Sequence, residues 1–370
     1  MSLAYTPLDP TQLSAGAQRA LNPGPGRMMA ARGIMPLAPA EQLAVLYQLS
    51  IDGDAALAQA ATATASGMPE KLVSGTLADP ALDPRVLDFF GQLGSDKPAI
   101  FDAVVMNPAA ADATIATLAA KGGAREVDLI AQNEQRLLRH PEIIAAMYMN
   151  RKARMSTIDR VVELAVRNSV RVPGLAAWDE VARALTGAAP ADPDADALFA
   201  MAADQLSGDD APLTTGDAEQ VVSEDEANAA VALDEDVPIA QLSVPSKIRL
   251  AQLGNAFARA ALIRDPLKLV QLAAIKSPGV TDIEAARYAG NQTLGEDVIR
   301  YISQRREWTK MYGVKVSLCR NPKTPIAEAV KFLPFLRAKD LTNLSKSKGI
   351  PSALVAQCRK LLMARGGGKG

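Results

Sequence analysis

Histidine and cysteine are almost absent from this chain of 370 residues, which contains one histidine, His140, and two cysteines, Cys319 and Cys358. Two cysteines are too few for a disulfide framework or a zinc site with four cysteine ligands, and a lone histidine removes most histidine-based catalysis and metal binding. We expect His140, which precedes Pro141, to cap a helix or lie at the surface, and both cysteines to be small buried hydrophobic residues. We therefore expect no catalytic residue, metal, cofactor or small-molecule ligand, and we expect that the chain is not an enzyme.

Aromatic residues are also scarce, at 4% of the chain, whereas apolar residues make up 48%. A core of small aliphatic side chains, with alanine as the main filler, favours helices. No run of 18 consecutive apolar residues occurs, and the N-terminus lacks a basic region followed by an apolar core. We therefore expect no membrane span and no signal peptide, which predicts a cytoplasmic protein.

The near-neutral net charge of −1 hides three differently charged stretches. Residues 1–187 carry 17 basic and 19 acidic side chains, residues 188–237 carry none and 14, and residues 238–370 carry 23 and 8. Like charges repel, and the middle stretch has little apolar surface to offset chain entropy. The charge pattern therefore predicts a disordered acidic linker over residues 191–237.

The linker divides the chain into two expected helical-repeat domains. One spans residues 27–190 and the other, which is basic, spans residues 238–363. The proline-rich residues 1–26 are expected to form an extended arm, and the glycine-rich residues 364–370 a disordered tail.

A recurrent pattern appears in both halves, in which an apolar helix end runs into a polar turn and a new helix. The turns lie at Asn107, Asn150, Ser277 and Asn321, with spacings of 43 and 44 residues within each half. A second shared turn follows downstream, as in Gly290-Asn291-Gln292. Each unit is thus expected to be a pair of helices, and its length suits the roughly 40–47 residues of HEAT and armadillo repeats.

Apolar residues recur with helical periodicity, and strand signals are nearly absent. One helical stripe has apolar residues at i, i+3, i+4 and i+7, namely Ile326, Ala329, Val330 and Leu333. A second stripe has them at i, i+4 and i+7, namely Leu354, Cys358 and Leu361. In the N-terminal half, the pattern predicts helices near residues 39–50, 54–65, 68–77, 84–93, 97–106, 111–121, 126–132, 135–149, 156–167 and 174–186.

On these motifs the chain resembles the HEAT-like, variant leucine-rich helical repeats of bacterial proteins. The residues that carry the resemblance run from Arg320-Asn321-Pro322 through Lys339-Asp340-Leu341 to Gly349-Ile350-Pro351. The resemblance covers most of residues 240–362 well and residues 70–186 loosely. It implies an all-α protein with two α-solenoid-like domains, and a scaffold or adaptor role.

Basic residues crowd into residues 305–360 and are our candidates for binding a partner or polyanion. Because a solenoid presents successive helix ends on one surface, their charges would add up to one positive stripe. The alternative is that they are spread over solvated faces. The candidates are Arg305, Arg306, Lys310, Lys315, Arg320, Lys323, Lys331, Arg337, Lys339, Lys346, Lys348, Arg359 and Lys360.

A positive stripe would attract nucleic acid, an acidic partner protein, an anionic membrane surface or the acidic stretch of this same chain. Trp308 and Tyr312 stand four residues apart among the cations, where they would either stack on bases or fill the joint between adjacent repeats; the second reading is favoured.

Three functions follow, in order of preference. The first is a non-enzymatic scaffold or adaptor that binds protein partners, whose identity the sequence leaves open, on its helical faces. The second is a nucleic-acid-binding protein that uses the basic domain, with the acidic linker as an intramolecular competitor. The third is a HEAT-like DNA glycosylase that uses Glu307, Trp308 and Tyr312.

Overall fold

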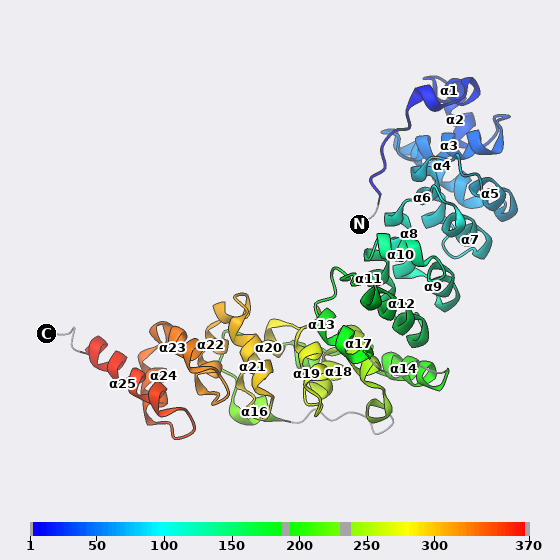
Figure 1. The fold of residues 1–370 in the computed structure, drawn as a ribbon. Coiled ribbons are helices and arrows are strands. Elements are labelled where there is room, and N and C mark those ends of the chain that lie inside the picture. Colours follow the sequence, from blue (N-terminus) through cyan, green and yellow to red (C-terminus); the bar gives the residue numbers. More distant parts are fainter. Residues whose placement is uncertain (1–2, 187–192, 230–237, 367–370) are drawn as a thin grey trace. The chain divides into compact units, whose positions relative to one another are not determined.

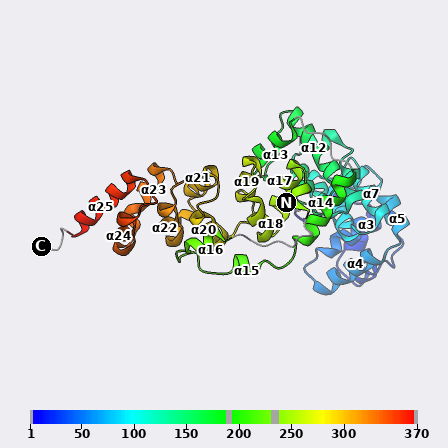
Figure 2. The same ribbon diagram turned by 90° about the horizontal axis from the view of Figure 1, so that it is seen from below.

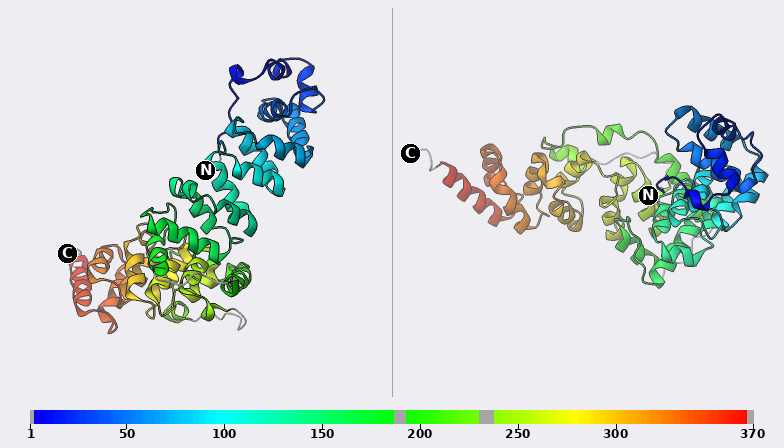
Figure 3. Two further views of the ribbon diagram at one scale, coloured as in Figure 1. Left: turned by 45° about the vertical axis from the view of Figure 1, so that its right-hand side comes forward. Right: turned by 90° about the horizontal axis from the view of Figure 1, so that it is seen from above.

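The computed structural model describes residues 3–186, 193–229 and 238–366. Within these residues every regular element is an α-helix or a short 3₁₀ helix, and none is a strand, which confirms the all-α prediction (Figures 1 and 3). The chain divides into two compact units, residues 1–174 and 175–370.

The N-terminal unit begins with a 3₁₀ helix, η1, and continues through twelve α-helices. Several start at a proline in the first turn, where the missing N–H costs nothing, and Asp54 and Asp83 cap two of them. The elements are η1 (Pro10–Gln12), α1 (Ala15–Leu21), α2 (Gly26–Ala31), α3 (Pro39–Ser50), α4 (Ala55–Gly67), α5 (Glu70–Leu77), α6 (Pro84–Leu93), α7 (Pro98–Met106), α8 (Asp112–Lys121), α9 (Ala124–Ile130), α10 (Glu134–Arg139), α11 (Glu142–Tyr148) and α12 (Met155–Arg167).

One predicted helix of this unit, 135–149, is two helices in the structure. α10 ends at Arg139, His140 is its C-cap residue, and α11 begins after Pro141. Proline has no N–H to donate and disfavours helical geometry in the residue before it. The capping position expected for His140 is confirmed, and its Nε2 lies 2.5 Å from Asp112.

The C-terminal unit contains the remaining elements that the structure describes. They are α13 (Trp178–Leu185), α14 (Pro193–Gln205), α15 (Ala211–Thr214), α16 (Glu224–Asn228), η2 (Ile239–Gln241), α17 (Val244–Leu253), α18 (Ala256–Leu262), α19 (Lys268–Ile275), α20 (Asp282–Gly290), α21 (Glu296–Gln304), η3 (Trp308–Lys310), α22 (Tyr312–Arg320), α23 (Ile326–Phe332), η4 (Leu333–Phe335), α24 (Ala338–Lys346) and α25 (Ser352–Gly366).

Helices of this unit alternate between two rows. In the first row each helix packs on the next, in the order α19, α21, α23 and α25 (Figure 2). In the second row the order is α20, α22 and α24, and α18 lies beside α20 at the start of this row. α18, α20, α22 and α24 begin at residues 256, 282, 312 and 338, so a helix pair recurs every 26 to 30 residues.

The spacing of 43 and 44 residues is therefore not the repeat. Asn107 ends α7, which packs between α5 and α9, whereas Asn150 follows α11, which packs on α8. Ser277 and Asn321 likewise follow helices of different rows. Helices of both rows end in the same kind of polar turn. The spacing of 43 and 44 residues therefore separates turns that belong to different rows and lie one and a half helix pairs apart.

Buried asparagines at these turns tie each helix end to an earlier one of its own row. Asn107 Nδ2 donates to the carbonyl oxygens of Leu77 and Asp79, at 2.7 and 2.9 Å. Its Oδ1 accepts from the N–H of Ala109 at 2.8 Å. Such bonds satisfy carbonyls at helix ends that would otherwise be buried without a partner. The same pattern recurs at Asn150, with Ala119 and Gly122, and at Asn321, with Ala289 and Asn291.

The prediction of an extended arm over residues 1–26 is wrong. η1 and α1 form within it, α2 begins at Gly26, and Ala17 and Ala20 are buried. Ahead of η1, Leu8 is buried and the Tyr47 hydroxyl donates to the carbonyl oxygen of Thr6 at 2.8 Å. Prolines shorten these helices without preventing their packing.

The boundary between the halves also differs from the prediction of residue 190. α13 packs on α17 and α19 of the C-terminal unit, and its buried Glu180 pairs with Lys276 at 2.9 Å. At the other end, α25 continues to Gly366, so the predicted tail begins too early. Residues 367–370 lie outside the described part.

Residues 193–229 of the predicted disordered linker are packed on the C-terminal unit. α14 contacts α17, and its Phe199 is buried with the Arg249 guanidinium 4.7 Å from the ring centre. α15 and α16 contact α20. The composition argument missed this because hydrogen-bond donors and a few apolar side chains of another segment hold these residues. Residues 191–192 and 230–237 of the predicted linker lie outside the described part.

Candidate functional site

The thirteen predicted cations lie on η3, on α22 to α25 and in the turns between them. Lys315, Arg320 and Lys323 are half-buried and the other ten are exposed. Several have local partners: Arg320 pairs with Asp340 at 3.4 Å, Lys331 with Glu328 at 2.8 Å, and Lys323 Nζ donates to the carbonyl oxygen of Leu294 at 2.6 Å. Within the described residues, the side chains without a hydrogen bond, ion pair or ring contact are those of Arg306, Lys310, Lys339, Lys346, Lys348 and Lys360, whereas Arg305 and Arg337 contact aromatic rings.

The structure brings some of these cations together with aromatic rings beside α22. The Arg337 guanidinium lies 4.5 Å from the ring centre of Tyr312, and the Lys315 ammonium lies 5.6 Å from that of Phe335. The Tyr312 hydroxyl donates to Asp340 at 2.5 Å, and burial together with this carboxylate raises the pKa of Tyr312. Phe335 is 67% exposed.

Trp308 belongs to the core, as the favoured reading of the sequence expected. Its side chain is buried, its ring meets Tyr301 edge-on at 6.2 Å, and the Arg305 guanidinium covers it at 5.8 Å. It therefore fills the joint between α21 and α22 and offers no free ring face for stacking.

A second arrangement emerges along the other row of helices. Residues 206–229, which we call the acidic strap, run over α18, α20 and α22, and we call the covered surface the strap face. α15 and α16 lie on the outer side of this row (Figure 2). The strap therefore spans three successive helix pairs of the unit.

Side chains of the strap face bind main-chain carbonyls of the strap. Arg287 Nη1 donates to Leu213 at 2.8 Å, Asn291 Nδ2 donates to Ala227 at 2.7 Å, and Arg264 Nη2 donates to Ala229 at 2.7 Å. These three carbonyls belong to the short helices α15 and α16 or to the residue that caps α16. Main-chain acceptors exist at every residue, so these contacts recognise the backbone of the strap and not a particular side chain. The carbonyls of Leu206 and Gly208 accept in the same way from Asn255.

Three carboxylates of the strap add charge and direction. Asp210 accepts from the N–H of Ala256 at 2.7 Å, and Glu219 accepts from the N–H of Tyr312 at 2.7 Å. Glu226 pairs with Arg287 at 3.4 Å. Charge-assisted hydrogen bonds of this kind are stronger than neutral ones, so the acidic character of the strap contributes to its binding.

The strap also approaches α22 closely at Gly313. A Cβ at this position would lie 2.1 Å from the carbonyl oxygen of Gln220 and 2.6 Å from that of Ala218. Only glycine, which has no side chain, allows two carbonyl oxygens to come this near. This close approach fixes the position at which the strap turns.

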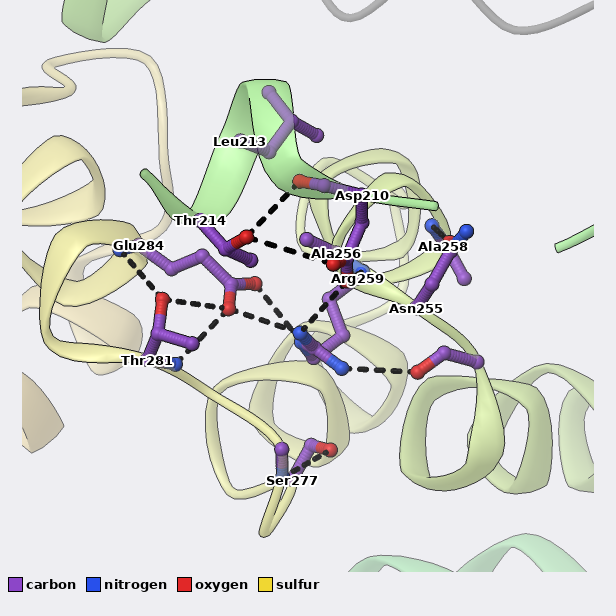
Figure 4. Close-up of polar contacts among 12 residues, drawn as sticks. Asp210, Leu213, Thr214, Asn255, Ala256, Ala258, Arg259, Ser277, Thr281 and Glu284 are labelled. Atoms are coloured by element: carbon purple, nitrogen blue, oxygen red, sulfur yellow. Dashed lines mark hydrogen bonds and ion pairs between the residues drawn. The ribbon is translucent and has the colours of Figure 1, made fainter. Parts of the chain in front are cut away.

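The floor of the strap face is held by a buried ion pair between α18 and α20 (Figure 4). Arg259 bonds both carboxylate oxygens of Glu284, at 2.8 and 2.9 Å, and donates to the carbonyl oxygen of Gly254. Glu284 in turn accepts from Thr281 in a capping box and from the Tyr288 hydroxyl at 3.3 Å. Burial next to this carboxylate raises the pKa of Tyr288. Every polar atom of the pair is satisfied, so it acts as a structural tie.

A cavity of about 380 Å³ remains between the strap and the helices beneath it. Leu213 lines it from the strap, and Phe257, Ala260 and Tyr288 line it from α18 and α20. The Arg264 and Arg287 side chains edge the cavity but are bonded to strap carbonyls. The free surface of the cavity is therefore mostly apolar.

The arrangement can hold a polypeptide segment. Among the described residues no group of three or more histidine, cysteine or acidic side chains is placed to hold a metal ion, and none of the helices there is long and apolar enough to cross a membrane.

Comparisons with models of protein families, with curated proteins and with solved structures find no match to this chain.

The sequence indicated the strap but not the residues that bind it. The charge contrast made the acidic stretch a possible partner of the basic half. However, none of the hydrogen bonds and ion pairs of the strap in the described structure involves one of the thirteen cations. Of the contact residues, Asn291 and Gln292 belonged to a pattern seen in the sequence, the turn Gly290-Asn291-Gln292, and Tyr312 belonged to the aromatic pair with Trp308.

Proposed function

We propose that this protein is a non-enzymatic scaffold whose α-solenoid-like, HEAT-like helix pairs bind extended segments of partner proteins. The observation that carries the proposal is the acidic strap itself. The C-terminal unit holds the 24 residues of the strap, whose only regular elements are the short helices α15 and α16, using side chains of α20 and of the turns beside α18 and α20 as donors to strap carbonyls.

Main-chain recognition suits a scaffold because it tolerates different partner sequences. In the strap, the side chains of most residues remain exposed while the carbonyls are bound. A partner segment would make the same carbonyl contacts whatever its side chains, and carboxylates at the places of Asp210, Glu219 and Glu226 would fix its register.

The test uses a fluorescein-labelled peptide of residues 206–229 and measures its binding to the full chain by fluorescence anisotropy. The full chain carries Asp210→Ala, Glu219→Ala and Glu226→Ala, which weaken its own strap and leave the strap face intact. We call this chain the opened chain. Saturable binding is expected at micromolar to millimolar peptide, and no binding up to about 1 mM, the weak end of measured affinities, would contradict the proposal.

Two further changes in the opened chain locate the binding. Arg287→Ala removes a donor to Leu213, and Gly313→Ala places a methyl group against the peptide backbone; each should weaken binding at least about five-fold, the effect of losing one good hydrogen bond. Arg300→Ala and Gly349→Ala are the matched controls, because Arg300 pairs with Glu296 on α21 and a Cβ at Gly349 meets nothing within 4 Å. Equal effects of test and control variants would place binding elsewhere.

Nucleic-acid binding by the basic region is the second candidate function. The six exposed candidate cations without a hydrogen bond, ion pair or ring contact in the described structure favour it, since they keep their charge available for phosphate. The strap would compete through its charge, because its contacts lie on the strap face. A HEAT-like DNA glycosylase has less support, because Trp308 is buried and Tyr312 is bonded to Asp340.

A further inference from the structure

The acidic strap fills the strap face poorly. Of its side chains, only Leu206, Ala218 and Ala227 are buried, and two of these are alanines. Directly beneath it lies the cavity of about 380 Å³ lined by Leu213, Phe257 and Tyr288. The cavity is half open to solvent, and the part of it that Leu213 leaves unfilled gains no dispersion or apolar contacts from the strap.

The strap instead keeps its place through covalent attachment. A segment joined to its own binding site has an effective concentration of the order of millimolar, so weak contacts suffice to hold it. A separate segment with the same carbonyl and carboxylate contacts needs additional apolar burial to displace it. The cavity offers that burial at one defined place, next to Leu213.

We propose that the acidic strap is a self-inhibitory occupant of the strap face, and that the partner is an extended acidic segment with a larger apolar side chain, such as phenylalanine, at the place of Leu213. This inference rests on the proposed function. The partner segment shares the register and the charge pattern of the strap. It binds more tightly than the strap because its larger side chain fills more of the cavity.

The first experiment compares labelled peptides of residues 206–229 that differ only at Leu213. Against the opened chain, the Leu213→Phe peptide should bind at least about five-fold tighter than the unchanged peptide, and the Leu213→Ala peptide about five-fold weaker, as expected from the change in buried apolar area. Equal affinities of the three peptides would overturn the inference, because the cavity would then not be used.

The second experiment places the same change in the chain. Leu213→Phe in the otherwise unchanged full chain should lock the strap, so that the Leu213→Phe peptide binds at least about five-fold more weakly than to the unchanged chain. Leu267→Phe is the matched control, since Leu267 is 44% exposed on the same unit and outside the strap face. A decrease that is equal for both chains, or no decrease, would contradict self-inhibition.

Charge is tested in the Leu213→Phe peptide. Glu226→Gln removes the partner of Arg287 and should weaken binding at least about three-fold, the effect of one partly exposed charge pair. Glu224→Gln, on the same short helix and without a hydrogen bond or ion pair in the described structure, should not. Equal effects would show that the acidic pattern is not recognised.

The two proposals fail in different ways. If no peptide binds the opened chain, the proposed function fails. If the unchanged peptide binds but the change to phenylalanine has no effect in either experiment, the strap face binds extended segments and only the inference about its partner fails.

Discussion

At the scale of single residues, asparagine ties the helix ends together at three of the four polar turns, at Asn107, Asn150 and Asn321. Its amide donates two hydrogen bonds and its carbonyl accepts, so one residue can bond two carbonyls of an earlier helix end and one N–H of its own turn. Asn321 does this with Ala289, Asn291 and Lys323. Aspartate cannot donate these bonds, and serine offers a single donor.

Asn321→Ala should therefore lower the free energy of unfolding of the C-terminal unit by about 1–3 kcal/mol, because buried carbonyls lose their partners. Asn343→Ala is the matched control: Asn343 is exposed on α24, and its replacement should change the stability by less than about 0.5 kcal/mol. Urea denaturation followed by circular dichroism measures both. Equal changes would show that the turn bonds contribute nothing specific.

The cysteines are buried, as the sequence predicted. Both are fully shielded, and burial raises the pKa of the Cys319 thiol to about 12 and also raises that of Cys358. The reactive thiolate is then scarce near neutral pH. We expect that neither thiol reacts with Ellman's reagent at pH 8 in native protein over minutes and that both react at once in denaturant. Rapid reaction of the native protein would show that α22 and α25 separate readily.

At the scale of helices, the apolar stripes predicted for the C-terminal half are partly right. Ala329 and Leu333 are buried, but Ile326 is 45% exposed. Apolar periodicity indicates which side of a helix faces the core. It does not indicate how much of the helix length a neighbouring helix covers. Ile326 is the first residue of α23, and Leu333 lies in the 3₁₀ turn η4 that follows this helix. In α25, Leu354 and Cys358 are buried whereas Leu361 is half-buried.

Leu333→Ala should accordingly destabilise the C-terminal unit by about 2–5 kcal/mol, the range for truncating a fully buried leucine. Ile326→Ala, on the preceding helix α23, should cost about 1 kcal/mol or less because much of its side chain already meets water. Thermal unfolding of the two full-length variants checks the difference. The burial assigned to α23 and η4 would be wrong if Ile326→Ala destabilised more.

At the scale of the molecule, the exposed cations allow a prediction for the second candidate function. The full chain should bind a short DNA duplex of any sequence with a dissociation constant of roughly 10⁻⁴–10⁻⁶ M at physiological salt. Changing Lys346 and Lys348 to Glu should weaken binding for all sequences alike and reduce the slope of log affinity against log salt by about 2, since each lysine would release one counterion.

The matched control changes Lys71 and Lys152 to Glu, because both are exposed lysines of the N-terminal unit and the net charge falls equally. It should leave the slope unchanged if binding is local to the basic region. An anisotropy titration that shows no binding at about 50 mM salt, where phosphate contacts dominate, would remove the support for nucleic-acid binding.

The amino-acid sequence by itself determined most helix positions. The predictions of 39–50 and 84–93 match α3 and α6 at both ends, and the other helices predicted in the N-terminal half agree within a few residues, except 135–149, which is α10 and α11. α1 and α2 were not predicted. Prolines, aspartate caps and apolar periodicity act over one or two turns, so they are visible locally. The burial expected for Trp308, as a residue that fills a joint between helices, and for both cysteines, as small hydrophobic residues, is also confirmed.

Only the tertiary structure decided which helices form one row, that α13 belongs to the C-terminal unit, and that residues 193–229 of the acidic stretch contact this unit. The candidate site shows the reason. Arg264, Arg287 and Asn291 meet strap carbonyls that lie 35, 74 and 64 residues away along the chain. Such contacts depend on where the rows place two distant segments, and main-chain acceptors leave no mark in the sequence. Charge counting therefore found a basic half and an acidic stretch, but the residues that join them were set by packing.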